Sequence, residues 1–110
     1  MMSLRTGLLR AAAVAGIAGT LALAPAAPAQ AAAYGDYTAS GVRIRSCANT
    51  GCTIRGLGYP GQGVYITCFR YGEYIGNNSI WYYHRNRTTG VVGYSHSSLV
   101  NFNSGTVPRC

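Results

Sequence analysis

The four cysteines of this 110-residue chain carry its clearest chemical signal. They occupy positions 47, 52, 68 and 110, so that 4, 15 and 41 residues lie between them. Structural zinc sites use pairs of closely spaced ligands, which this pattern lacks, so we expect no metal. An even number of cysteines in a short secreted chain instead predicts disulfides, and four cysteines allow three pairings. We favour Cys47–Cys52, which closes a polar turn, and Cys68–Cys110, which ties the C-terminal segment to a predicted strand.

Catalytic combinations are scarce because the chain contains only two acidic residues. Asp36 lies in a small polar segment ahead of the predicted strands, so no Ser-His-Asp triad is evident. Glu73 is then the single acid of the predicted fold, whereas glycoside hydrolysis needs a pair of carboxylates. One enzymatic alternative is a small secreted ribonuclease with Glu73 as base, His84 as acid, and Arg85 and Arg87 as phosphate ligands. The surrounding sequence is not typical of such enzymes, so we expect no catalytic residues and no cofactor.

Arginine and tyrosine dominate the remaining candidates. Residues 34–110 hold seven arginines against two acidic residues, a net charge of +5 with neutral histidines. They also hold nine tyrosines, two phenylalanines and one tryptophan. A basic domain favours polyanions or anionic surfaces, although positive charge also serves solubility. Because tyrosine offers a flat apolar face and a polar tip, which suit sugar rings, peptides and protein surfaces, this composition indicates binding.

The N-terminal segment predicts export. Arg5 and Arg10 form a basic region, residues 11–24 form an apolar run, and small residues then allow cleavage after Ala31 or Ala33. This order is typical of a secretory signal peptide. A membrane anchor is the alternative, but the apolar run is about 14 residues, short of the ~20 that a spanning helix needs. We therefore expect an extracellular protein, and export argues against nucleic acid as its partner.

From Gly41 onward the chain is a series of short β-like runs separated by turn signals. In the first run, valine and isoleucine alternate with arginine at the period of two that is typical of a half-buried strand. The predicted strands cover residues 41–46, 52–57, 63–70, 79–85 and 91–96, and a tight helical turn with a last short strand covers 97–100. Nothing has helical periodicity, so we predict a small all-β barrel or sandwich.

Several motifs, taken in order, resemble the bacterial SH3-like domain. They are V-R-I-R-S from position 42, I-R-G from 54, G-Q-G-V-Y-I from 61, W-Y from 81, and T-G followed by G-Y between 89 and 94. The resemblance implies a five-stranded barrel. The residues that it places inside are Val42, Ile44, Ile54, Val64 and Ile66. Two positions depart from the pattern, since His84 and Ser95 stand where the family usually has inward valines.

The resemblance also implies a binding site. In SH3-like barrels the ligand groove lies between the first long loop, the second loop and the strand that carries the tryptophan. Here these are residues 55–59, residues 71–78 and Trp81, and arginines beside them could meet carboxylates or phosphates. The candidate binding residues are Tyr59, Arg70, Tyr71, Tyr74, Trp81, Arg85 and Tyr94. The alternative is that these tyrosines only shield a thin core.

We therefore expect a secreted, non-catalytic, monomeric module that binds a cell-wall component, either a peptidoglycan glycopeptide or an anionic wall polymer. The alternative is a free secreted module that binds or inhibits another protein. Neither expectation includes nucleic acid or a stable membrane anchor. The predicted organisation is a cleaved signal peptide at 1–33, a flexible lead-in at 34–40, an SH3-like barrel at 41–101, and a disulfide-tied tail at 102–110.

Overall fold

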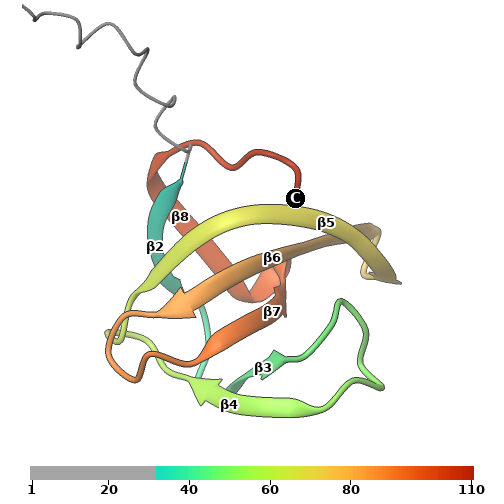
Figure 1. Ribbon diagram of the computed structural model, residues 1–110, viewed down its shortest axis with the longest axis horizontal. Coiled ribbons are helices and arrows are strands. Elements are labelled where there is room, and N and C mark those ends of the chain that lie inside the picture. Colours follow the sequence, from blue (N-terminus) through green and yellow to red (C-terminus); the bar gives the residue numbers. More distant parts are fainter. Residues whose placement is uncertain (1–31) are drawn as a thin grey trace, which may run out of the picture.

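The computed structural model describes residues 32–110, which form one antiparallel sheet curled into a half-barrel (Figure 1). The strands follow the order β4-β3-β7-β6-β5-β2-β8, and the long strand β5 arches over β6. The elements are β2 (Ala33–Tyr37), β3 (Val42–Arg45), β4 (Ile54–Gly58), β5 (Val64–Ile75), β6 (Asn78–Asn86), β7 (Val92–His96), the 3₁₀ turn η2 (Ser97–Leu99) and β8 (Val100–Gly105). The all-β class is confirmed. The expected signal peptide lies outside the described residues, apart from its last two positions.

The structure has seven strands, so the prediction of five was wrong. The additional strand β2 takes up much of the expected lead-in at 34–40 and lies between β5 and β8. Ala33 pairs with Ile66 on one side and Gly105 on the other, and it is fully buried. The strand β8 likewise extends into the expected tail at 102–110. Both segments become strands because neighbouring backbones satisfy their amides and carbonyls, not because of a hydrophobic pattern of their own.

The core lies on the concave side of the curled sheet. Four residues that the sequence placed inside are buried there: Val42, Ile44, Val64 and Ile66. Ile54 was expected with them, but its side chain is 46% exposed. The β3–β4 pairing contains a bulge next to Ile44, and a one-residue shift turns a side chain to the other face of a strand. Because β4 is an edge strand, Ile54 has no second neighbour to cover it.

Two polar residues occupy the inward positions at which the sequence departs from the family pattern. His84 is fully buried, its Nε2 lies 3.1 Å from the Tyr37 hydroxyl, and its Nδ1 lies 3.2 Å from the Tyr82 carbonyl. The buried Ser95 hydroxyl donates to the Arg43 carbonyl at 2.8 Å. Both residues are tolerated because each buried polar atom has a hydrogen-bonding partner.

Both predicted disulfides are present. Cys47–Cys52 closes the turn after β3, and Cys68–Cys110 fastens the C-terminal segment to β5. Backbone hydrogen bonds support the second bridge, since the Phe69 amide donates to the Pro108 carbonyl at 2.9 Å and the Cys110 amide to the Phe69 carbonyl at 2.8 Å. Within residues 32–110 no helix is long and apolar enough to cross a membrane.

Candidate functional site

A pocket of about 310 Å³ opens beside the only tryptophan of the chain. Its walls come from the β2–β3 link, β3, the disulfide loop, the end of β5, and the junction of β7 with η2. The lining residues are Ala39, Ser40, Gly41, Val42, Arg43, Arg45, Thr50, Ile75, Trp81, His96 and Leu99. A concave site with apolar walls and a few convergent polar groups is the usual form of a small-ligand site.

The indole of Trp81 forms part of the pocket lining and is held on several sides. It is 2% exposed and meets the His96 ring edge to face at 5.3 Å between centroids. Its Nε1 donates to the Glu73 carbonyl at 3.0 Å. Gly72 makes this arrangement possible, because a Cβ there would lie 2.9 Å from the indole and 2.3 Å from the Ala48 carbonyl oxygen. The indole is therefore fixed in place, and only a small accessible part of it borders the pocket.

The rim opposite Trp81 is the disulfide loop, and Glu73 fixes its position. The backbone amide and the hydroxyl of Thr50 both donate to a Glu73 carboxylate oxygen, each at 2.7 Å. These two bonds, together with the charges of Arg45 and His96, hold the pKa of the Glu73 carboxyl below its ordinary value. Arg45 also donates to the Thr50 carbonyl at 2.8 Å, so this guanidinium is engaged in holding the loop.

Arg43 supplies the remaining charge of the pocket. Its side chain is exposed, and within residues 32–110 no hydrogen bond engages its guanidinium. The pocket thus pairs an apolar lining, provided by Trp81, Ile75 and Leu99, with one guanidinium whose donors are free. This combination suits a ligand that has an apolar or ring-shaped part next to a carboxylate or phosphate.

The structure separates the predicted site residues into three places. Trp81 lines the pocket. Arg70 and Tyr94 lie outside it, where the guanidinium stands 5.9 Å from the ring centroid of the tyrosine. Arg85 stands over Tyr65 at the same distance. These three residues therefore share the outer surface of the sheet with one another but do not line the pocket with Trp81.

The remaining predicted tyrosines lie on loops and on the C-terminal side of β5. Tyr59 is exposed in the turn between β4 and β5, and Tyr74 is 69% exposed near the end of β5. Tyr71 is stacked under Arg109 at 4.9 Å. Of the segments expected to border the groove, residues 71–78 contribute Ile75 to the pocket lining, and residues 55–59 contribute none.

Sequence reasoning missed most of the pocket wall. The lining residues that were not expected at the site include Ala39, Ser40, Gly41, Arg43, Arg45, Thr50, His96 and Leu99. Arg43 and Arg45 alternate with the buried residues of β3, which was a usable signal that both point outward. Because β3 pairs with β7, and β7 pairs with the strand that carries Trp81, this signal could have placed both arginines near the tryptophan. The position of Thr50 was not readable, because it depends on how the disulfide loop folds back onto Glu73.

The residues of the ribonuclease alternative are not brought together. The His84 ring is enclosed in the core, whereas the side chains of Arg85 and Arg87 are exposed. The Glu73 carboxylate is bonded to Thr50 in the loop region.

We compared the chain with models of protein families, with curated proteins and with solved structures, and none of them matches it.

Proposed function

We propose that this protein is a secreted, non-catalytic SH3-like module that binds a cell-wall component in the pocket beside Trp81. One observation carries the proposal: a buried, pre-positioned indole and an unengaged guanidinium, that of Arg43, line one 310 Å³ pocket. Support for the wall as the location comes from the N-terminal signal sequence and from the resemblance of residues 41–101 to SH3-like domains.

The chemistry of a peptidoglycan glycopeptide fits this pocket. Sugar rings and short aliphatic side chains can pack on the partly exposed Ile75 and Leu99, beside the small accessible part of the Trp81 indole. A peptide carboxylate can take a bidentate hydrogen bond from Arg43. Because Glu73, Arg45 and the disulfide hold the rim in place, little conformational entropy is lost when the ligand binds.

A pull-down on purified cell-wall sacculi at low salt tests the proposal. The wild-type protein should sediment with the sacculi, and R43Q should bind about tenfold more weakly, the usual effect of losing one charge-assisted hydrogen bond. R109Q is the matched control, because it removes one arginine that lies outside the pocket. Wild-type protein that stays wholly in the supernatant would contradict the proposal, as would equal losses in the two variants.

A second function, a free secreted protein-binding module or inhibitor, is favoured by the edge strand β4. Its Ile54 and Leu57 side chains are 46% and 42% exposed, and the strand has a free hydrogen-bonding edge. Apolar side chains on an open edge are suited to strand addition by another protein. Cross-linking in culture medium distinguishes this function, because it should capture one stoichiometric protein partner, and capture should fail for I54S/L57S.

A further inference from the structure

We propose that the outer surface of the sheet is a second binding site, which takes a linear polyanion. The site consists of three exposed arginines and the tyrosines that they cover, and we call it the arginine–tyrosine face. Its members are Tyr34, Tyr65, Arg70, Arg85, Arg87 and Tyr94. None of these residues lines the pocket, so this proposal goes beyond the glycopeptide function and does not depend on it.

The strand register places one half of the face together. Tyr34 of β2 pairs with Tyr65 of β5, which in turn pairs with Arg85 of β6. The two tyrosine rings meet edge to face at 5.1 Å, the Arg85 guanidinium stands 5.9 Å from the Tyr65 ring, and the Arg87 guanidinium stands 4.9 Å from the Tyr34 ring. Directly paired residues project from the same side of a sheet, so this cluster forms one surface.

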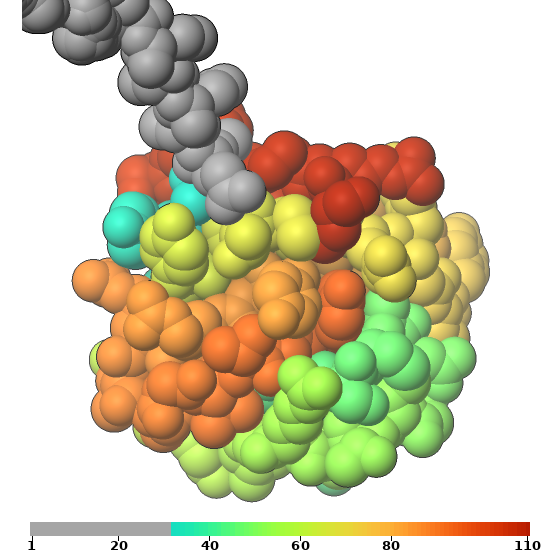
Figure 2. Space-filling view, viewed as in Figure 1, coloured from blue at the N-terminus to red at the C-terminus, as the bar shows by residue number. Residues whose placement is uncertain are grey.

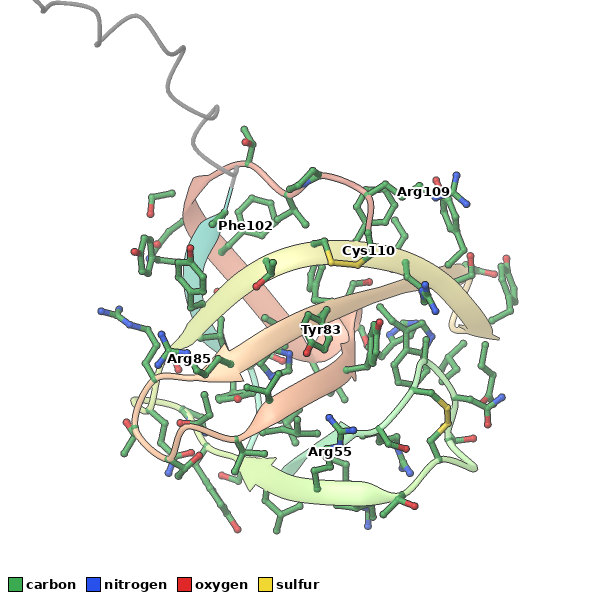
Figure 3. The ribbon with its side chains drawn as sticks, viewed as in Figure 1. Arg55, Tyr83, Arg85, Phe102, Arg109 and Cys110 are labelled. Carbon is green, nitrogen blue, oxygen red and sulfur yellow. A yellow bond between two sulfur atoms is a disulfide. The ribbon has the colours of Figure 1, made fainter. Side chains whose placement is uncertain are left out.

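The other half continues the same side of the sheet along β6. Tyr83 stands two residues from Arg85 and packs against Tyr94 of β7 at 5.0 Å, and Arg70 of β5 reaches over the Tyr94 ring. Figure 3 shows Tyr83 and Arg85 along β6, and Figure 2 shows atoms of β5, β6 and β7 side by side on the same side of the molecule, with the C-terminal segment lying against β5.

Within residues 32–110 no carboxylate side chain neutralises the charge of this face. The chain has only two acidic residues, and both are engaged elsewhere. Asp36 accepts hydrogen bonds from the amides of Gly61 and Gly63, and Glu73 accepts from Thr50. The three arginines therefore face solvent as unpaired cations, which favours an anionic partner.

Stacking on tyrosine leaves these arginines ready to bind oxyanions. A guanidinium carries five N–H donors, and within residues 32–110 no hydrogen bond engages those of Arg70, Arg85 or Arg87, which stand 4.9–5.9 Å from tyrosine ring centroids. The tyrosine also restricts the rotamers of the long side chain, which lowers the entropy lost on binding. Each arginine of the face can therefore form a bidentate contact with a phosphate or a carboxylate.

The spacing of the arginines requires a polymer. Arg70 pairs with Trp81, four residues from Arg85, so the backbone positions of the two arginines are roughly 13 Å apart along the strand, and Arg87 follows in the turn after β6. No single small anion spans that length, whereas a chain with an oxyanion on each repeating unit does. Nucleobases are a poorer match, because an arginine stands 5.9 Å or less from the centroid of each tyrosine ring of the face and leaves less aromatic surface for a base to stack on.

Binding of end-labelled polyphosphate and of polyglutamate, measured by fluorescence anisotropy at several salt concentrations, tests the proposal. Binding of either polymer at low salt supports the face as an oxyanion site, and the two probes separate phosphate from carboxylate recognition. We expect R70Q/R85Q/R87Q to bind the polymer about thirtyfold more weakly, because each exposed arginine contributes about a threefold effect and the three effects multiply. The slope of log K against log salt should fall by about 1 for each arginine removed.

The matched control is R109Q, which loses an arginine that is also stacked on a tyrosine, at 4.9 Å from Tyr71. R85Q should lower both the affinity and the salt slope, whereas R109Q should leave the slope unchanged. Equal effects of the two substitutions would mean that net charge alone attracts the polymer, and would overturn the site. Failure of both polymers to bind would also overturn it, as would a preference for single-stranded DNA or for anionic vesicles over both polymers. Because neither probe carries a glycopeptide, this result is independent of the sacculus experiment.

Discussion

Acidification from pH 7 to pH 4 should remove about 3 kcal/mol of the free energy of unfolding through one side chain, His84. The ring is fully buried, and burial lowers its pKa from 6.5 to about 4, against the smaller opposite effect of the Tyr82 carbonyl. Burial also raises the pKa of Tyr37 to about 12, so its hydroxyl stays protonated and donates to Nε2. Nδ1 then carries the imidazole proton and donates to the Tyr82 carbonyl.

The sign follows from proton binding. Between pH 6.5 and pH 4 the unfolded chain binds a proton at His84 and the folded chain does not, so stability falls as the pH falls through this window. One pKa unit corresponds to 1.36 kcal/mol, and a difference of about 2.5 units gives about 3 kcal/mol. Below pH 4 the contribution of His84 to the free energy of unfolding no longer changes with pH. Asp36 and Glu73, whose pKa values are lowered in the folded state, then account for further losses.

Urea unfolding at a series of pH values, followed by the fluorescence of the buried Trp81, measures this effect. H84Q keeps a hydrogen-bonding group but cannot titrate, so its stability should change about 3 kcal/mol less than that of the wild type between pH 7 and pH 4. Parallel curves for the wild type and H84Q would refute the reasoning. An NMR titration showing His84 of the wild type protonated near pH 6.5 would refute it without relying on any variant.

Three other perturbations test the fold. C68S/C110S should lower the free energy of unfolding by roughly 4 kcal/mol, and C47S/C52S should lower it by roughly 2 kcal/mol. The first effect is larger because Cys68–Cys110 closes the longer loop. Guanidinium titrations under oxidising conditions measure both free energies. A chain that begins after Ala33 loses a buried residue that pairs with Ile66, so it should be about 1–2 kcal/mol less stable than a chain that begins at residue 32. We expect N-terminal sequencing of the exported protein to find cleavage before residue 32, which keeps Ala33 in the fold. Gly93→Ala should cost about 2 kcal/mol or more in thermal unfolding, since its Cβ would lie 2.5 Å from the Arg45 carbonyl oxygen.

The strands that carry a hydrophobic alternation could be predicted from the sequence. Val64 and Ile66 alternate with polar neighbours, and both are buried as expected. The 3₁₀ turn Ser97–Leu99 and both cysteine pairings were also predicted correctly. These features depend on local pattern or on chain geometry, so a single sequence contains the information that specifies them.

The strand β2 could not be predicted from the local sequence pattern. Its sequence is A-Y-G-D-Y, in which a glycine and an aspartate separate the two tyrosines and leave no hydrophobic alternation. The strand forms because of distant partners: a Cβ at Gly35 would lie 1.8 Å from the Asn101 carbonyl oxygen, and the Asp36 carboxylate accepts from the amides of the turn at residues 61–63. Ile54 is the converse case, since its own pattern predicted burial but a bulge in the β3–β4 pairing left it exposed.

The hydrogen bonds of the two acidic residues affect both the fold and the two proposed sites. Glu73 contacts three separate parts of the pocket, because its amide donates to Ala48, its carbonyl accepts from the Trp81 indole, and its carboxylate accepts from Thr50. Asp36 holds the turn between β4 and β5 in the same way. In a chain with seven arginines after residue 33, acids placed for ion pairing would have cancelled charge at the surface. Because both carboxylates bind backbone amides instead, they position loops and leave Arg43 of the pocket and the arginines of the arginine–tyrosine face free for anionic ligands.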